Sequence, residues 1–425
     1  MANKKITNKA KRKTKKAAVK ALKKHPQVFI ALFLILMLIV GACVGVYIVK
    51  PELFESLLHV ENHNHKTINA NTGVTYDDFQ IHFMTLGNDK AGDSVYIKAG
   101  ETDILIDAGS RSNSSETTIP YMNQYVKDNK LEYVIATHGD QDHIEAFPKI
   151  AEKYSFGTII TNRNTVKTSN TYKKMVTTFE NQVSKGAKWV YADECYDNKN
   201  GGKRTYQLSD KVTMDIIYNY YYWNTSNDEN NYSVCTMFTY ASNSGNKYFL
   251  LTGDLEKEGE AKLVEYYNSS SKEKTLPEVD LYKAGHHGSK TSSNEDFLEL
   301  IKPKMCVVSC CCGTDEYTEN TDNQFPTQAF ITRIAKWTDA VYVTSIYETY
   351  TIEKNSKGKE YIHTTGRKDM NGNVIVSCGE SDETVQIGLA CSNNTTKLKD
   401  SDWMKTKVTI DGQERYVRTM PNEWK

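Results

Sequence analysis

The sequence predicts a mixed α/β protein: a four-layer αββα sandwich, with two β-sheets inside and helices outside, preceded by one transmembrane helix. Three observations lead to this prediction. Short apolar strands come first and are followed by alternating helices and strands, and this order occurs twice along the chain. Of the 425 residues, 39% are hydrophobic, which is enough for a sizeable core. A stretch of 22 residues near the N-terminus carries no charge.

The uncharged stretch covers residues 28–49 and predicts a transmembrane signal-anchor. With a rise of about 1.5 Å per residue it spans about 33 Å, and the bilayer core is about 30 Å thick. Residues 1–50 contain twelve Lys or Arg and no Asp or Glu. Because basic flanks stay in the cytoplasm, we expect residues 1–27 to be a cytoplasmic tail of a single-pass protein of the cell membrane, with the remaining chain extracellular. The alternatives are a cleaved signal peptide and lipid attachment at Cys43, but the length of the apolar run favours the anchor.

The charges of the chain are segregated. The whole sequence has 53 basic and 53 acidic residues, so the chain beyond residue 50 keeps 41 basic residues and a net charge of −12. This acidic part is not an electrostatic trap for phosphate polymers, which counts against tight, non-specific binding of nucleic acid and leaves a local basic groove open. The nine cysteines show no regular pairing, so we expect mostly free, buried thiols, with a Cys378–Cys391 disulfide as the alternative.

The first half of the folded part begins after a polar linker over residues 50–76. Alternation of polar and apolar residues between Gly turns predicts strands, and apolar residues at helical spacing predict helices. The predicted strands are 79–84, 94–97, 102–107, 131–137 and 158–160, and the predicted helices are 118–130, 147–154 and 171–186.

The second half repeats the order of strands followed by interleaved helices. The predicted strands are 212–217, 233–240, 248–251, 279–283, 305–309 and 340–344, and the predicted helices are 255–267, 295–301 and 327–337. One large domain is therefore expected over residues 77–390. A C-terminal extension over residues 391–425 contains Trp403, a possible hairpin at 408–417 and Trp424, and we expect it to pack on the domain or bind a partner.

A run of polar residues follows the predicted strand 131–137. His138, Asp140, Asp142 and His143 lie within six residues, and imidazole nitrogens and carboxylate oxygens are ligands that zinc accepts. On an extended segment the first two point the same way and can hold one ion, while Asp142 and His143 on the following turn can reach a second. The alternative is a polar loop in which Asp142 caps a helix that begins at His143.

This run resembles the metal-binding motif HxHxDH of the metallo-β-lactamase superfamily. With Asp at its second position, the motif is similar to the form in the C-terminal metallohydrolase domain of ComEC-type competence proteins. Three further segments follow in the family's order, and the resemblance covers about residues 78–390. They are Ile104-Leu105-Ile106-Asp107-Ala108-Gly109, Phe249-Leu250-Leu251-Thr252-Gly253-Asp254 and Lys283-Ala284-Gly285-His286-His287-Gly288-Ser289-Lys290-Thr291-Ser292.

The resemblance implies two divalent metal ions, zinc first and manganese as a competitor. Its implied ligands are His138, Asp140, Asp142, His143, Asp254 and His286, with Asp254 bridging the two ions. It also implies that Asp107 supports the metal loop and that His287 donates a hydrogen bond from outside the metal shell. Considered singly, Asp254 is a possible helix cap and His287 a possible structural histidine.

One departure from the family concerns the first metal. The superfamily commonly adds a histidine between the first motif and the bridging Asp, but from Asp142 to Asp254 only His143 occurs. An Asn-x-Ser pattern, Asn231-Tyr232-Ser233, stands there instead, as in ComEC-like sequences. The first site is therefore one ligand short, and its higher share of carboxylate makes manganese or magnesium more competitive with zinc.

The expected activity is hydrolysis by a two-metal-activated hydroxide, with Asp142 and Asp254 as the catalytic carboxylates. The resemblance favours a phosphodiester substrate: nucleic acid, a cell-wall polymer or a small molecule. Lys290 is expected to neutralise a phosphate oxygen, with Ser289 donating a hydrogen bond, unless Lys290 is a solvated surface residue. The alternatives are a lactone or β-lactam hydrolase and a non-catalytic surface-binding module.

The sequence leaves the oligomeric state open. The aromatic segment 218–223 is expected to be partly exposed and able to stack on a ring.

Overall fold

The computed structural model describes residues 68, 70–269, 275–314, 316–318 and 320–425. The predicted cytoplasmic tail, the predicted anchor over residues 28–49 and most of the predicted linker lie outside the described residues. Among the described residues, no helix is both long and apolar enough to cross a bilayer. Residues 70–72, which the sequence places in the linker, form a short strand of the first sheet.

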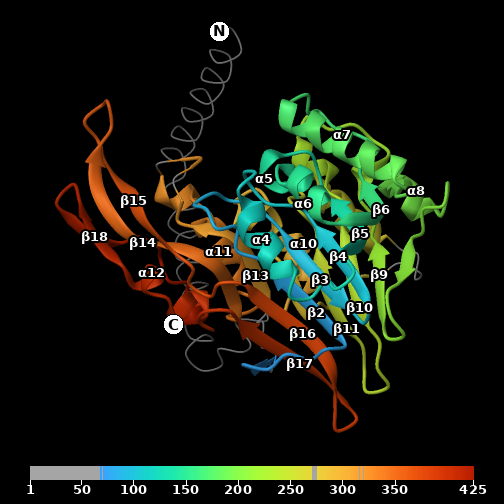
Figure 1. Cartoon of the computed structure of the whole chain (residues 1–425). Coiled ribbons are helices and arrows are strands. Elements are labelled where there is room, and N and C mark those ends of the chain that lie inside the picture. Colours follow the sequence, from blue (N-terminus) through green and yellow to red (C-terminus); the bar gives the residue numbers. More distant parts are fainter. Residues whose placement is uncertain (1–67, 69, 270–274, 315, 319) are drawn as a thin grey trace, which may run out of the picture. The chain divides into compact units, whose positions relative to one another are not determined.

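The first of two large β-sheets has nine strands in the order β1-β17-β16-β2-β3-β4-β5-β6-β7 (Figure 1). Strands β2 to β4 are antiparallel neighbours, whereas β4 to β7 run parallel. The strands are β1 (Ala70–Thr72), β2 (Phe79–Phe83), β3 (Val95–Ala99), β4 (Thr102–Ile106), β5 (Lys130–Ala136), β6 (Ser155–Thr161), β7 (Lys188–Tyr191), β16 (Val374–Ser381) and β17 (Thr384–Cys391).

The second sheet has eight strands in the order β15-β14-β13-β12-β11-β10-β9-β8, and β11 to β14 run parallel. A separate hairpin, β18–β19, packs near β15. The strands are β8 (Thr205–Gln207), β9 (Val212–Ile216), β10 (Thr236–Tyr240), β11 (Lys247–Leu251), β12 (Leu281–Lys283), β13 (Cys306–Cys312), β14 (Val341–Lys354), β15 (Glu360–Lys368), β18 (Lys407–Ile410) and β19 (Gln413–Tyr416).

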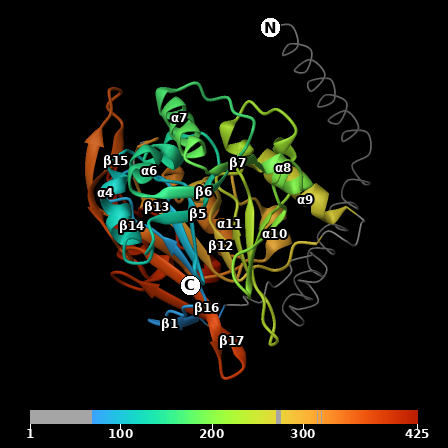
Figure 2. The same ribbon diagram turned by 45° about the vertical axis from the view of Figure 1, so that its right-hand side comes forward.

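Helices cover the outer faces of both sheets, which gives the four layers that the sequence predicts. In Figure 2, α4, α6 and α7 gather on one side of the sheets and α9 and α10 on the other. The α-helices are α4 (Ser114–Met122), α5 (Gln141–Ile144), α6 (Phe147–Lys153), α7 (Asn170–Ser184), α8 (Ala192–Asp197), α9 (Lys257–Asn268), α10 (Glu295–Ile301), α11 (Gln328–Ile334) and α12 (Asp402–Lys405). The 3₁₀ helices are η1 (Tyr220–Tyr222), η2 (Glu229–Tyr232), η3 (Gly285–Gly288), η4 (Thr321–Asn323), η5 (Leu398–Asp400) and η6 (Asn422–Trp424).

Three apolar cores hold the layers together. One lies between the sheets and joins residues such as Phe79 and Phe238. A second lies between the nine-stranded sheet and its helices, where α7 buries Met175 and Phe179 on one face. The third lies between the eight-stranded sheet and its helices. Burial of these apolar surfaces is the main favourable term in folding.

One difference from the predicted elements concerns the helix expected over residues 118–130. The structure has α4 from Ser114 to Met122 instead, followed by turns. Tyr125 and Val126 still pack onto the same core as Met122, but from the turn. Helical spacing therefore marked residues that contact the core without marking where the helix ends.

The C-terminal extension packs on the helical side of the eight-stranded sheet. Trp403 and Trp424 are both buried in that core, and Trp424 Nε1 donates to the carbonyl oxygen of Thr338 at 3.0 Å. Of the two outcomes expected for this segment, packing on the domain is the one observed. Cys378 and Cys391 are free thiols that face other residues across the β16–β17 ladder, so the structure does not contain the alternative disulfide.

Glu260 on α9 is buried and holds the start of α10. It accepts hydrogen bonds from the backbone N–H groups of Ser293 (2.5 Å) and Asn294 (2.9 Å) and from Asn294 Nδ2 (2.6 Å). Burial raises the pKa of Glu260 from its ordinary value of 4.5 to about 7, although these donors oppose the shift. The folded protein therefore binds more protons at this site than the unfolded chain between about pH 4.5 and 7.

We accordingly expect the free energy of unfolding to fall as the pH rises through this window, by up to about 3 kcal/mol for this group. Urea unfolding of the full chain measured across the window should show this dependence, and Glu260→Gln should remove it. Glu265→Gln, an exposed residue of the same helix, is the matched control and should keep it. Parallel pH profiles for the wild type and Glu260→Gln would contradict the assignment.

Candidate metal centre

The candidate site lies where four strands end at one edge of the two sheets. In the first sheet the parallel strands β4 and β5 lead directly to Asp107 and His138. In the second sheet the parallel strands β11 and β12 lead to Asp254 and to the pair His286-His287. Since parallel strands share the edge at which they end, residues from distant parts of the sequence meet there.

Four buried side chains form the centre of the site: Asp93, His143, Asp254 and His287. Each offers one ligand atom, and these atoms all lie within 4.8 Å of one another. We call these four residues the core cluster. Three imidazoles converge on Asp254 Oδ2, with Nε2 of His143 at 3.0 Å, Nε2 of His287 at 3.3 Å and Nε2 of His286 at 3.9 Å. Asp254 is thus the central residue of the site, as the sequence predicts for a shared carboxylate.

Asp107 orients the His143 ring by binding Nδ1, the nitrogen that faces away from Asp254. Its carboxylate accepts hydrogen bonds from the backbone N–H and hydroxyl of Thr137, both at 2.8 Å, and from His143 Nδ1 at 2.7 Å. The contact with Nδ1 leaves Nε2 of His143 facing Asp254, an arrangement typical of histidines that bind metals. Asp107 therefore occupies the supporting position that the resemblance implies for it.

The two histidines of the Gly-His-His-Gly turn differ in depth. His287 is fully buried, its Nδ1 donates to the carbonyl oxygen of Ser309 at 2.8 Å, and its Nε2 also lies 3.3 Å from Asp142 Oδ2. The side chain of His286 is 22% exposed, and its Nδ1 lies 2.7 Å from Glu256 Oε1. The resemblance implies His286 as the ligand and His287 as its support, whereas the geometry favours His287 as part of the core cluster.

The other members of the first motif lie beside the core cluster. His138 is buried, its ring centroid is 4.2 Å from that of His143, and its Nε2 lies 3.5 Å from Asp140 Oδ2. Asp140 also forms an ion pair with Lys167. Asp142 is partly exposed, with Oδ2 at 3.9 Å from His143 Nε2 and a side chain that is 16% exposed. In the described residues, His138 and Asp140 are not joined by a third close ligand atom.

Two buried residues of the site were not predicted from the sequence as site residues: Asp93, and Lys283 at the start of the third quoted motif. Lys283 forms an ion pair with Asp93, lies 3.5 Å from Asp254 Oδ1, and donates to the carbonyl oxygen of Gly253 at 3.2 Å. Each stands at the end of an apolar strand, Asp93 before β3 and Lys283 at the close of β12. A charged residue at the end of a buried strand is the signal that identifies such positions.

The charges of the site raise and lower one another's pKa values. Burial lowers the pKa of His143, but the carboxylates of Asp254, Asp107 and Asp142 outweigh it and hold the pKa well above its usual range. Burial raises the pKa of Asp254, but the neighbouring histidines and Lys283 lower it well below its usual value. The centre thus contains an excess of buried carboxylate that requires positive charge for compensation.

The residues of the Asn-x-Ser pattern support the site rather than line it. The Ser233 hydroxyl accepts from the backbone N–H of Asp254 at 3.0 Å, and Asn231 Oδ1 accepts from that of Gly259 at 3.2 Å. Gly253, the residue before Asp254, has a φ of +56°, and a Cβ there would lie 2.9 Å from Ser233 Oγ. Only glycine fits this turn without displacing its neighbours.

The predicted phosphate contacts lie further out. Lys290 Nζ donates to Asn323 Oδ1 at 3.1 Å in an exposed position. The Ser289 hydroxyl is bound to that of Thr291 at 2.8 Å, and Thr291 donates to Glu256. The cations that lie within the site are instead Lys167 and Lys283.

The side chains present fit a divalent cation. His138 Nε2 and Asp254 Oδ1 are buried and form no hydrogen bond among the described residues beyond the long ionic contacts of 3.5 Å with Asp140 and Lys283. Buried polar atoms of this kind are rarely left unpaired, and imidazole and carboxylate are the donors that zinc and manganese accept.

Part of the chain matches the model of one known protein family. Residues 87–207, which include β3 to β8 and the whole first motif, match the family model of the metallo-beta-lactamase superfamily. This segment is therefore similar to the metallo-beta-lactamase superfamily. Metal-dependent hydrolysis is the general activity of this superfamily, and divalent metals, typically zinc, are its usual cofactors. The resemblance inferred from the motifs is confirmed.

Three curated proteins are similar to segments of this chain. ComE operon protein 3 of Bacillus subtilis (strain 168) is 38% identical over 66 residues, which is 16% of this chain and 8% of that protein. Recombination protein 2 of Haemophilus influenzae is 35% identical over 65 residues, 15% of this chain and 7% of the relative. Competence protein ComA of Neisseria gonorrhoeae is 22% identical over 226 residues, 53% of this chain and 26% of the relative. The matched segments therefore span at most about a quarter of these relatives.

Among solved structures, a subclass B3 metallo-beta-lactamase from a soil metagenome library is 11% identical to the chain. It covers 48% of this chain, and the match spans 76% of that structure with a TM-score of 0.29.

Proposed function

We propose that this chain is a membrane-anchored, outward-facing, metal-dependent phosphodiesterase. The observation that carries the proposal is the core cluster, Asp93, His143, Asp254 and His287, in which two buried imidazoles and two buried carboxylates converge. The resemblance of the motifs to ComEC-type metallohydrolase domains favours a phosphodiester as the scissile bond. Nucleic acid, a cell-wall polymer and a small organophosphate are the candidate substrates.

Divalent metal would be held by His143, Asp254 and His287, with Asp142 at its open side, and His138 and Asp140 are the candidate ligands of a second ion. Zinc or manganese bound there would supply Lewis-acid polarisation of the phosphate and of water. The remaining roles belong to the chain itself. Asp107 fixes the tautomer of His143, and Lys283 neutralises Asp93.

Asp142, on α5, and Lys167, in the loop between β6 and α7, are partly exposed charged residues near the core cluster. The Asp142 carboxylate is partly exposed, and its pKa is lowered, since His143 and His287 oppose the effect of burial. It therefore remains ionised and can accept a proton from water. Lys167 is 31% exposed beside Asp140 and supplies a positive charge for a phosphate oxygen. In this proposal Lys167 has the role expected from the sequence for Lys290, which is bonded to Asn323 instead.

The proposal is tested with the full chain and bis-p-nitrophenyl phosphate in the presence of Zn²⁺ or Mn²⁺. We expect metal-dependent release of p-nitrophenol, lost on addition of EDTA and reduced at least about 100-fold in Asp142→Ala, as for loss of one proton-transferring group. Asp296→Ala, an exposed carboxylate on α10, is the matched control. Unchanged turnover in Asp142→Ala would place the chemistry elsewhere.

A substrate panel separates the alternatives. Hydrolysis of a lactone or β-lactam without hydrolysis of any diester would identify a hydrolase of the other class, and no turnover with a metal-loaded protein would leave a binding module.

For the anchor, we expect protease added to intact cells to digest residues 65–425 and to spare the N-terminal tail. Recovery of the chain in the soluble fraction would contradict anchoring.

A further inference from the structure

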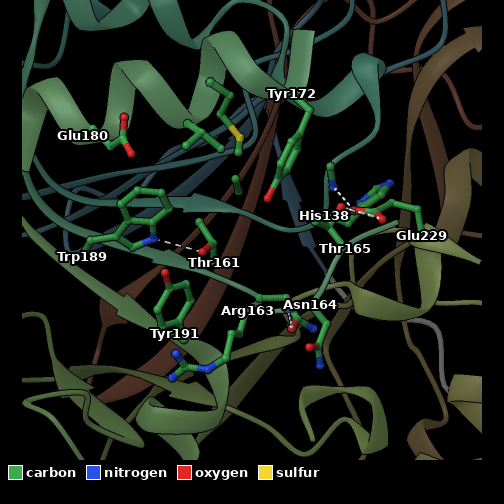
Figure 3. A pocket seen from close by; sticks show the side chains of 15 residues that line it. His138, Thr161, Arg163, Asn164, Thr165, Tyr172, Glu180, Trp189, Tyr191 and Glu229 are labelled. Atoms are coloured by element: carbon green, nitrogen blue, oxygen red, sulfur yellow. Dashed lines mark hydrogen bonds between the residues drawn. The ribbon is translucent and has the colours of Figure 1, made fainter. Parts of the chain in front are cut away.

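A pocket of about 220 Å³ opens beside the metal centre, between α7, β7 and the loop that follows β6 (Figure 3). His138 lines the end of the pocket nearest the core cluster, and its ring lies 4.2 Å from that of His143. A substrate bound at the metal centre therefore has a neighbouring group within reach of this pocket. Pockets for whole small-molecule ligands measure about 300–1,000 Å³, so this smaller pocket has room for one ring of a larger substrate.

Three aromatic side chains form the walls: Tyr172 from α7, and Trp189 and Tyr191 from β7. Their side chains are half-buried and held in place by their neighbours. Trp189 packs edge-on against Phe179, with ring centroids 5.6 Å apart, and Arg163 lies over the Tyr191 ring at 4.1 Å. Aromatic surfaces that are already fixed bind a ring with little loss of conformational entropy.

Most polar groups of the pocket already have partners within the protein. Trp189 Nε1 donates to Thr161 Oγ1 at 3.0 Å, and Thr165 Oγ1 donates to Glu229 at 2.9 Å. Glu229 also accepts from the backbone N–H of Gly139 at 2.8 Å. Further in, the lining is Ala136, Met175 and Val176.

The placement of paired polar groups and apolar side chains in the pocket favours one of the two kinds of ring that stack on aromatic residues, a sugar or a nucleobase. A sugar carries hydroxyl groups around its whole rim, and each would lose its water without finding a free partner in the apolar interior. A nucleobase has two apolar faces and keeps its polar atoms on the edge. That edge can meet Asn164 Oδ1 and the exposed Glu180 carboxylate, which line the pocket. Arg163 also lines it but is paired with Asp193 and Glu194.

We propose that this pocket binds one nucleobase of the substrate, next to the scissile phosphodiester. The inference rests on the proposed function and specifies its substrate: a nucleic-acid strand or dinucleotide with an unpaired base beside the metal centre. Lys167 follows the loop that lines the pocket and forms an ion pair with Asp140, two residues from His138, so its charge is available to a phosphate bound between the two sites. Stacking on Tyr172, Trp189 and Tyr191 tolerates any base, so we expect weak sequence preference.

The test measures binding by isothermal titration calorimetry to the full chain in EDTA, which separates binding from turnover. The probes are a deoxydinucleotide, glucose 1-phosphate and glycerol 3-phosphate. We expect the dinucleotide to bind most tightly and Trp189→Ala to weaken it by about 5- to 150-fold, the range for one lost base–aromatic stack. Trp223→Ala, an exposed tryptophan that does not line the pocket, is the matched control and should leave the affinity unchanged.

Trp189 packs against Phe179, so Tyr172→Ala serves as a second variant and should weaken the dinucleotide in the same direction. Tighter binding of glucose 1-phosphate than of the dinucleotide would overturn the inference in favour of a sugar. Equal binding of the dinucleotide and glycerol 3-phosphate by a protein that hydrolyses bis-p-nitrophenyl phosphate would overturn it and leave the phosphodiesterase intact. Absence of hydrolysis with dinucleotide affinity that depends on Trp189 would overturn the phosphodiesterase alone.

Discussion

Replacing Lys283 by methionine is expected to lower the free energy of unfolding by about 3–5 kcal/mol, the usual cost of breaking a buried ion pair. Lys283 and Asp93 are almost fully buried, with 2% and 1% of their side chains exposed, and they form an ion pair inside the metal centre. Methionine fills a similar volume but leaves the Asp93 carboxylate buried and uncompensated. Urea unfolding of the full chain in EDTA measures the effect without a contribution from bound metal.

The double variant Asp93→Asn/Lys283→Met provides the decisive comparison. Because it removes both charges, we expect it to be more stable than Lys283→Met alone, and the difference measures the coupling of the pair. Lys149→Met, which breaks an exposed pair with Glu152, is the control and should change stability by less than about 1 kcal/mol. If Lys283→Met were as stable as the wild type, the ammonium group would not be compensating Asp93.

The second large effect concerns the histidine pair. We expect His287→Ala to weaken binding of Zn²⁺ or Mn²⁺ by more than about 100-fold, beyond the 10- to 100-fold typical of changes to supporting partners. The reason is geometric, since His287 Nε2 lies within 3.3 Å of both Asp142 and Asp254 in a fully buried position. The measurement is metal content per chain after dialysis, together with calorimetric titration of the metal-depleted protein.

His286→Ala is the matched comparison one residue away. Its imidazole is partly exposed, is bound to Glu256 and lies 3.9 Å from Asp254 Oδ2, so we expect a loss of at most about 10-fold. The reverse order, with His286→Ala losing the metal and His287→Ala keeping it, would restore the assignment that the family resemblance implies. Equal and large losses would mean that each histidine binds an ion.

The order of strands and helices could be predicted from the sequence because its signals are local. Alternation predicts β2, and the apolar run before His138 predicts β5, within one or two residues of their observed bounds. Ends of elements were less certain, as α4 illustrates, because a residue such as Val126 reports contact with the core whether it lies in a helix or in a turn. The αββα layers followed from element order alone.

The sequence by itself identified the candidate loop, since His138 to His143 lie within six residues, and motif order added Asp254 as a candidate. Only the tertiary structure decided which of His286 and His287 is the more deeply buried, that Lys167 rather than Lys290 pairs with Asp140, and that Asp93 and Lys283 meet across 190 residues of chain. The physical reason is that a buried charge is compensated by whichever strand end packs beside it. Strand order and register set that contact, and no local pattern of residues records it.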